Sequence, residues 1–239
     1  MDALGQLFYS LSIAMGIMIA YGSYVPREAN LVKSINQIEI FDTLVAILAG
    51  IMIIPAVFVF SGADGLSASG PSLIFVSLPK IFSAMGPVGN VVGAVFFLMV
   101  LFAAVTSAMS ILEAVVASLM DRFGMSRAKA TSLETVVAGV IGIIVCLGYN
   151  VLYFERKLPN GSPAQILDIL DYISNYALMP ILAIGTCILV GWVVKPQEVI
   201  KEATRNGEKF GRRTLYIMMI KFIAPVLLFV LLLMSLGVL

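Results

Sequence analysis

Charged residues are scarce in this chain. They make up 12% of its 239 residues, whereas a soluble domain carries about 25%. Hydrophobic residues make up 60%, and the mean hydropathy is +1.04. These values exclude an ordinary water-soluble domain and favour a protein embedded in a lipid bilayer. Membrane lipid is therefore an expected partner, and nucleic acid is not.

Cysteine is rarer still, with two residues, Cys146 and Cys187. Both lie in apolar runs and neither has the spacing of a metal-binding motif, so we expect buried thiols rather than a disulfide. A cleavable signal peptide is not expected either. Asp2 makes the start of the chain acidic, and the first apolar stretch leads onward into the chain.

The apolar residues occur in runs long enough to cross a bilayer. Hydrocarbon about 30 Å thick requires about 20 mostly apolar residues in a helix. The backbone must satisfy its own hydrogen bonds there, and the runs lack the alternation of membrane β-strands. The sequence thus predicts an all-α integral membrane protein of about six spans, covering residues 3–24, 41–60, 88–123, 132–153, 166–194 and 214–239.

The distribution of Lys and Arg predicts the orientation of these spans. The connectors 25–40, 121–131 and 195–213 together hold eleven cations, against three in the other connectors, and Lys221 lies within the last span. The first set is expected to face the cytoplasm, which places the N-terminus of this chain outside. A chain that begins in a span with its N-terminus outside indicates that something upstream is missing.

Polar residues inside the first span are candidates for function. Gln6, Ser10 and Ser12 precede Gly16 just before the middle of the span. Serine and glycine lower helix propensity and allow the backbone to open, which frees carbonyl and amide groups as ligands. Alternatively, the small residues pack against a neighbouring helix and the serines bond to the preceding turn.

The second and third spans contain further oxygen-bearing residues. Asp42 stands at the predicted start of the second span, where it is either a helix N-cap or a buried ligand. In the third span, one helical turn places the Ala103 carbonyl beside the hydroxyls of Thr106 and Ser107. This oxygen cluster suits a hard, weakly solvated cation, although simple back-bonding of the hydroxyls explains the same residues.

Two other groups of acidic residues lie within or at the edge of spans. Glu113 is deep in the third span and must be either protonated or partnered, so we interpret it as a buried structural acid. Asp168 and Asp171 begin the fifth span on its outer side. They are either ordinary acids of a first helical turn or part of an external gate.

At these residues the chain resembles the neurotransmitter:sodium symporter family. Residues 3–16, followed by Tyr21-Gly-Ser-Tyr24, are similar to the unwound sixth helix of that family. The similarity extends over essentially the whole chain. Further matching segments follow in order at residues 24–30, 102–107, 112–116 and 167–172.

This resemblance implies a fold as well as a family. Transporters of this kind contain two inverted five-helix repeats, with substrate and ions near the midplane between broken helices. Residues 1–194 resemble the second repeat with its discontinuous first helix, and residues 195–239 resemble a cytoplasmic loop and one further helix. Residues 61–87 would then form the extracellular loop that closes the outer vestibule. The first five-helix repeat is an expected partner that the chain lacks.

The resemblance also implies ligands, residue by residue. Ser10 and Asp42 match the first sodium site, and the Ala103 carbonyl with Thr106 and Ser107 matches the second. Gln6 and Asp171 match an outer gate. Tyr9 stands where the family usually has Phe, and Ala14 where it usually has Gly. The residues that match the substrate site are Tyr9, Ser12, Ala14, Met15, Gly16, Ser107 and Ile111.

The expected function is sodium-coupled symport of a neutral, hydrophobic amino acid across the bacterial cytoplasmic (inner) membrane. No bond is made or broken, so an enzyme is not expected. Chloride is not expected to be required, because the carboxylate of Asp42 can neutralise sodium as a bound chloride would. As the C-terminal half, the chain is expected to be inactive alone. The alternative is a free-standing six-span scaffold, regulator or pore subunit.

Overall fold

The computed structural model describes residues 10–65, 73–159, 161 and 163–237. The chain divides into two compact units, one from Ile35 to Met109 and one that combines Met1–Ser34 with Ser110–Leu239. Within the described residues, five helices are long and apolar enough to cross a membrane. They cover Leu31–Val59, Pro87–Phe123, Arg127–Gly148, Ile166–Val193 and Arg213–Ser235.

The first expected span is a broken helix. Ser10 is helical, residues 11–16 form turns and bends, and the short helix α2 then covers Ile17–Gly22. Residues 1–9 lie outside the described residues. The predicted discontinuous first helix is therefore confirmed at the point where the Ser/Gly cluster lowers helix propensity.

The helix that follows, α3 (Leu31–Gly65), begins earlier than predicted. We expected a connector as far as residue 40, but the backbone N–H of Lys33 donates to the Asn30 side chain at 2.8 Å. Asn30 thereby satisfies a free amide in the first turn, as a helix cap does. The polar residues after it form helical turns that precede the apolar run. Pro55 lies inside α3.

The unit Ile35–Met109 has its own small core. Helical turns η1 (Leu73–Ser77) and α5 (Leu78–Ala84) form within the segment 61–87, which was expected to be an extracellular loop. Val57 of α3 is 1% exposed and packs with Leu78 and Ile81. The Phe82 ring contacts Phe96 of α6 (Pro87–Phe123), with ring centroids 5.5 Å apart. This core holds the extracellular-loop candidate against two long helices.

The helix α7 (Arg127–Gly148) begins and ends before its predicted bounds of 132 and 153. A hairpin of two short antiparallel strands, β1 (Arg156–Lys157) and β2 (Pro163–Ala164), lies in the connector that follows. It was not expected from the sequence. In the same connector the Tyr153 hydroxyl donates to the Glu155 carboxylate, and this bond raises the pKa of Tyr153 above its ordinary value.

The last two spans contain π-helical turns that the sequence did not predict. The span from residue 166 to 193 consists of α8 (Ile166–Asp171), η2 (Tyr172–Leu178), α9 (Met179–Ile188) and η3 (Leu189–Val193). The amphipathic helix α10 (Pro196–Ala203) follows. The final span consists of α11 (Arg213–Met218), η4 (Met219–Ile223) and α12 (Ala224–Ser235).

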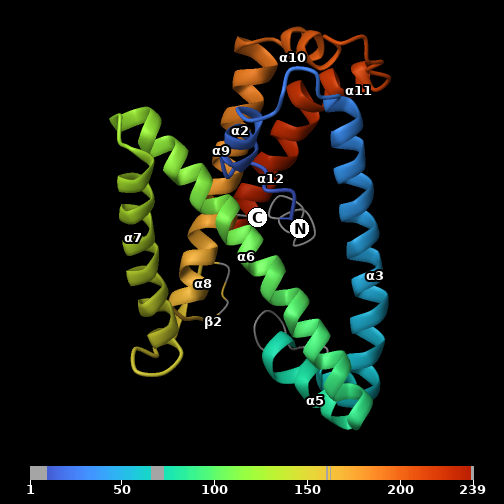
Figure 1. The fold of residues 1–239 in the computed structure, drawn as a ribbon, viewed down its shortest axis with the longest axis vertical. Helices are drawn as coiled ribbons and strands as arrows, with labels where there is room; N and C mark the ends of the chain where they lie inside the picture. The colour runs from blue at the N-terminus through green and yellow to red at the C-terminus, as the bar shows by residue number, and fades with distance from the viewer. Residues whose placement is uncertain (1–9, 66–72, 160, 162, 238–239) are drawn as a thin grey trace. The chain divides into compact units, whose positions relative to one another are not determined.

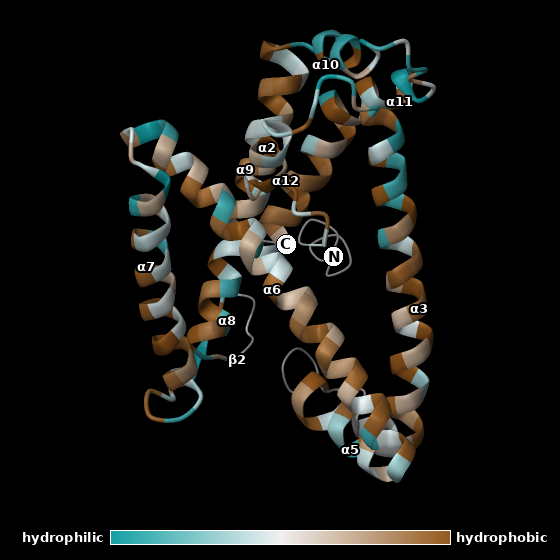
Figure 2. Ribbon diagram, viewed as in Figure 1, coloured by the Kyte–Doolittle hydropathy of each residue, from teal (hydrophilic) through white to brown (hydrophobic). Residues whose placement is uncertain are grey.

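Helices α9 and α12 lie side by side, and their interface is the core of the larger unit (Figure 1). Ala183 and Cys187 of α9 pack with Leu228 of α12, and all three are buried. Many large apolar side chains on other faces of these spans are exposed, such as Leu182 and Val226. Figure 2 shows hydrophobic residues along the long helices and hydrophilic residues around α10. This pattern is the one a lipid environment requires.

A buried polar clamp joins η2 to the end of α12. The hydroxyl of Tyr172, 8% exposed, donates to the Ser235 carbonyl at 2.6 Å. The Ser235 hydroxyl donates to the Tyr176 carbonyl at 2.7 Å, and the rings of Tyr172 and Tyr176 stack. These bonds satisfy buried polar groups at the end of α12, where the Ser235 hydroxyl also donates to the Leu232 carbonyl at 2.9 Å.

Tyr172→Phe should weaken this clamp and lower the free energy of unfolding by about 1–3 kcal/mol, because the buried carbonyl of Ser235 loses its donor. Unfolding followed by circular dichroism in detergent micelles measures the change. The matched control is Tyr153→Phe, whose hydroxyl bonds to an exposed carboxylate and whose loss should have little effect. Equal effects of the two substitutions would contradict the clamp.

Candidate functional site

The break in the first helix is held in an unusual backbone conformation. Ser12, Ala14 and Gly16 all have positive φ, at 53°, 64° and 79°. The left-handed region costs a residue other than glycine about 1–2 kcal/mol. Ser12 and Ala14 both adopt it, which indicates that the surrounding structure enforces this conformation. Only then does α2 begin, with the amides of Ile19 and Ala20 donating to the Gly16 carbonyl.

Neighbouring helices provide that support. Ala14 packs against the buried cluster of Ala183, Cys187 and Leu228 on α9 and α12. Ile17, the first residue of α2, is 4% exposed. Ser12, Met15 and Gly16 are half-buried, and Ser10 is exposed. The alternative of a continuous helix with tightly packed small residues is therefore wrong for residues 11–16.

On α6, Thr106 and Ala103 bring oxygen atoms together. The Thr106 hydroxyl donates to the Ala103 carbonyl at 3.0 Å and to the Phe102 carbonyl at 2.9 Å. A hydroxyl that donates its proton keeps acceptor lone pairs. Back-bonding of the Thr106 hydroxyl is therefore observed, and it is compatible with cation binding by the same oxygen atoms. The cation site itself stays a prediction. Ser107 and Thr106 are exposed.

Asp42 lies well inside α3, since that helix begins at Leu31 and carries its cap at Asn30. The alternative of Asp42 as an N-cap is therefore wrong. Its side chain is half-buried. Asp42 belongs to the unit Ile35–Met109 and Ser10 to the other unit. The first sodium site that would join them stays a prediction, as does a substrate site that combines Ser107 with residues 12–16 and Ile111.

Asp168 and Asp171 differ in their surroundings. Asp168 accepts a hydrogen bond from the backbone N–H of Gln165 at 3.0 Å and forms a capping box with that residue. It is thus an ordinary first-turn acid. Asp171 ends α8, is exposed, and accepts a hydrogen bond from the Asn175 side chain in η2. Gln6 and Tyr9, the other predicted gate and lid residues, lie outside the described residues.

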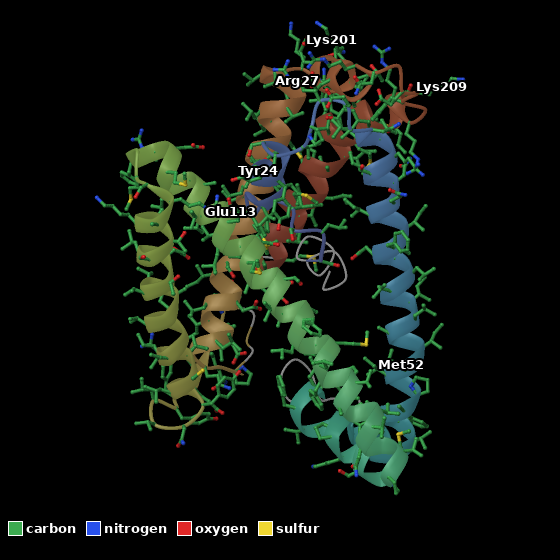
Figure 3. The ribbon with its side chains drawn as sticks, viewed as in Figure 1. Tyr24, Arg27, Met52, Glu113, Lys201 and Lys209 are labelled. Carbon is green, nitrogen blue, oxygen red and sulfur yellow. The ribbon has the colours of Figure 1, made fainter. Side chains whose placement is uncertain are left out.

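Glu113 has two partners, one on each carboxylate oxygen. The Tyr24 hydroxyl donates to Oε1 at 2.7 Å (Figure 3). Nη2 of Arg127 donates to Oε2 at 2.5 Å. The Glu113 side chain is 18% exposed and that of Arg127 is 60% exposed. An acid inside a long apolar helix is thereby neutralised by a cation at the start of the next helix.

A second hydrogen bond repeats this pairing three residues earlier, between the hydroxyls of Tyr21 and Ser110. The pairs Tyr21–Ser110 and Tyr24–Glu113 have the same sequence separation, 89 residues. Because the residue numbers increase in the same direction on both segments, α2 and the following turn run parallel to the adjoining part of α6. The sequence analysis missed Tyr21, Ser110 and Arg127 as partners. Tyr21 and Tyr24 are three residues apart, as are Ser110 and Glu113, and this common spacing could have indicated that the two segments pair.

Membrane-length helices together with a discontinuous helix are typical of secondary transporters. Comparison with known sequences names the family. The Sodium:neurotransmitter symporter family matches residues 1–239. The chain therefore belongs to this family, which consists of transporters and not of enzymes.

Individual relatives agree with this assignment. An uncharacterized sodium-dependent transporter of Bacillus subtilis, YhdH, is 31% identical over 99% of the chain and 51% of its own length. One from Haemophilus influenzae is 30% identical over 95% of the chain and 48% of its own length. Among solved structures, MhsT in complex with L-phenylalanine has a TM-score of 0.85 and 33% identity, covering 98% of the chain and 51% of MhsT. The chain thus spans about half the length of these relatives.

The two bonds to Glu113 lead to a prediction about stability. A double-mutant cycle of Glu113→Gln and Arg127→Gln should give a larger coupling energy than an exposed ion pair does, because the Glu113 side chain is only 18% exposed. Denaturant unfolding of the four proteins in micelles measures it.

The control is the exposed pair Glu202 and Arg205, whose atoms are 3.4 Å apart within one helical turn. Its coupling should be about 0.3–0.5 kcal/mol, as for other exposed pairs. If the Glu113 pair couples no more strongly than this control, the contact does not contribute to folding.

Proposed function

We propose that this chain forms the second half of a sodium-coupled symporter for a neutral, hydrophobic amino acid in the bacterial inner membrane. The observation that supports this most directly is the break at residues 11–16, whose three left-handed residues open the helix. Family membership and the sodium-dependent transporters among the relatives support the use of sodium. The substrate class draws support from MhsT, which was solved with L-phenylalanine.

In this proposal two sodium ions bind the broken and long helices. Ser10 and Asp42 contribute to one site, and the Ala103 carbonyl with the hydroxyls of Thr106 and Ser107 to the other. Carbonyl, hydroxyl and carboxylate oxygens are suitable ligands for a hard cation. Each sodium ion that enters at 100 mV releases roughly 2.3 kcal/mol, which drives substrate uptake.

The substrate would lie against the opened backbone. Ser12, Met15 and Gly16 offer half-buried groups there, and Ala14 shapes the stretch through its packing on α9 and α12. Tyr9 and Ile111 are proposed as further contacts, with Met15 and Ile111 as apolar walls. Asp171, together with Gln6, is proposed to line the outer gate. Substrate and ions would stabilise a closed state between outward and inward openings.

The proposed orientation follows from the charged connectors. α10 and its flanking loops carry Lys195, Lys201 and Lys209, and Arg27 lies at the same end of the unit (Figure 3). The side chain of Asn206 donates to the Arg27 carbonyl at 2.8 Å, which ties two of these connectors together. By the excess of cations, this end is cytoplasmic.

The half-transporter proposal predicts that proteoliposomes with residues 1–239 alone show no sodium-driven uptake of radiolabelled L-phenylalanine, because each site needs ligands from the first repeat. Co-reconstitution with a first five-helix repeat should restore uptake above that of empty liposomes. The same preparation without a sodium gradient is the control. Uptake by residues 1–239 alone would refute the proposal.

Asp42 leads to a separate prediction about anions. Uptake by the reconstituted transporter should persist when gluconate replaces chloride, since the carboxylate balances the charge of sodium. Asp42→Asn should make uptake dependent on chloride. The matched control is Asp121→Asn, which removes a carboxylate from an exposed position at the end of α6. Loss of most wild-type uptake in gluconate, or an Asp42→Asn protein that ignores chloride, would disprove the role of Asp42.

A further inference from the structure

One cation in the apolar part of the chain has no role in the proposed transport cycle. Lys221 lies in η4, within the span Arg213–Ser235 and eight residues beyond Arg213. At 1.5 Å per residue this corresponds to about 12 Å along the helix. A lysine within a span needs a partner or a route to the membrane surface, and it marks a functional site by default.

The structure shows its partner to be an aromatic ring. The Nζ atom of Lys221 lies 5.6 Å from the centroid of the Trp192 ring, within the range of a cation–π contact. Phe222 packs edge-on against the same ring, with centroids 5.9 Å apart. Among the described residues, Lys221 forms no ion pair with a carboxylate. Its ammonium therefore keeps donors for a ligand from outside the chain.

The position of this pair is set by close packing of two π-helical segments. Gly191 of η3 approaches the backbone of η4, and a Cβ at Gly191 would lie 3.3 Å from the Ile220 carbonyl oxygen. The adjoining helices α9 and α12 are joined by the buried cluster of Ala183, Cys187 and Leu228. Trp192 and Lys221 are thus presented together on a rigid helix pair.

The aromatic side chains beside Lys221 are exposed on the surface of the chain. Trp192 and Phe222 are each 57% exposed, although both are large aromatic residues in membrane-length helices. Lys221 is half-buried. An exposed apolar surface beside a cation offers two kinds of contact at once, one for hydrocarbon and one for an anion.

The depth of the pair rests on the orientation proposed above. Trp192 is next to the last residue of the span Ile166–Val193, and tryptophan is enriched at membrane interfaces. Side chains of a helix tilt toward its N-terminus, which for the last span is the cytoplasmic end. Lys221 therefore directs its ammonium toward the headgroups of the cytoplasmic leaflet, as snorkelling lysines do.

We propose that Lys221 and Trp192 form a binding site for an anionic phospholipid of the cytoplasmic leaflet. The ammonium of Lys221 donates charge-assisted hydrogen bonds to the lipid phosphate. The exposed faces of Trp192 and Phe222 hold the upper part of an acyl chain. The cations of the connector 195–213 lie at the same end of the span and attract anionic headgroups toward the site.

Trp192 is the one tryptophan of the chain, so its fluorescence reports on this site directly. The 239-residue chain is placed in phosphatidylcholine vesicles that contain a fixed fraction of a lipid brominated on its acyl chains. This lipid is either phosphatidylglycerol or phosphatidylcholine. Brominated phosphatidylglycerol should quench Trp192 more strongly, with a relative association constant about fivefold higher, as one cation near an anionic lipid provides.

Three variants locate the effect. Lys221→Gln should bring the relative association constant close to one, whereas Lys221→Arg retains the charge and should keep most of the preference. Lys201→Gln removes an exposed cation of α10 at the same end and should leave the preference in place. Far-UV circular dichroism checks that each variant is folded.

Equal quenching of the wild-type chain by the two brominated lipids would overturn the proposal without any variant. So would a preference that survives Lys221→Gln, or one that Lys201→Gln abolishes equally, since both would indicate general surface charge. The measurement needs neither sodium nor substrate. A failure of the transport proposal therefore leaves this result unaffected.

Discussion

The hydrocarbon of the bilayer supplies no partner for a backbone amide or carbonyl, and most of this structure is a response to that condition. Helices satisfy their own backbone, which is why the apolar runs fold as helices up to 37 residues long. The opening at residues 11–16 departs from this pattern. It occurs where α9 and α12 pack closely and where Ala14 contacts their core. A break in such a place requires surrounding protein, which accounts for its position beside the packed pair α9 and α12.

The same condition governs the charged side chains. Glu113 lies inside α6 and receives one donor on each carboxylate oxygen, from Tyr24 and Arg127. These contacts also fix the turn after α2 against α6, so a polar requirement determines how the broken helix is placed. The ammonium of Lys221 instead lies over the ring of Trp192 and forms no ion pair among the described residues. Glu113 thus has its hydrogen-bond donors within the chain. Lys221 has an aromatic ring on one side and is proposed to bind a lipid phosphate as well.

Much of the fold could be predicted from the sequence. Hydropathy located the spans, and the family resemblance, together with the Ser/Gly cluster, pointed to the break. The boundaries were less accurate, because hydropathy detects contact with hydrocarbon whereas a helix continues through polar turns. The start of α3 at Leu31, set by the Asn30 side chain, is an example. The π-helical turns were not predicted either, and two of them, η3 and η4, lie where Gly191 closely approaches the Ile220 carbonyl, a contact between helices that local sequence does not specify.

The predicted ligands divide in a similar way. The Ala103 and Thr106 oxygens meet because they are one turn apart on one helix, a relation that spacing alone determines. Asp168 and Asp171 have similar positions in the sequence, and in the structure the capping contact with Gln165 identifies Asp168 as a first-turn acid. The sequence by itself determined the membrane class and the approximate spans, because these depend on local composition and helical period, whereas the break in the first span was implied by the family resemblance and is held by tertiary packing. The tertiary structure decided which side chains meet across 89 residues, such as Tyr24 and Glu113, because the rotation and offset of packed helices are not local properties.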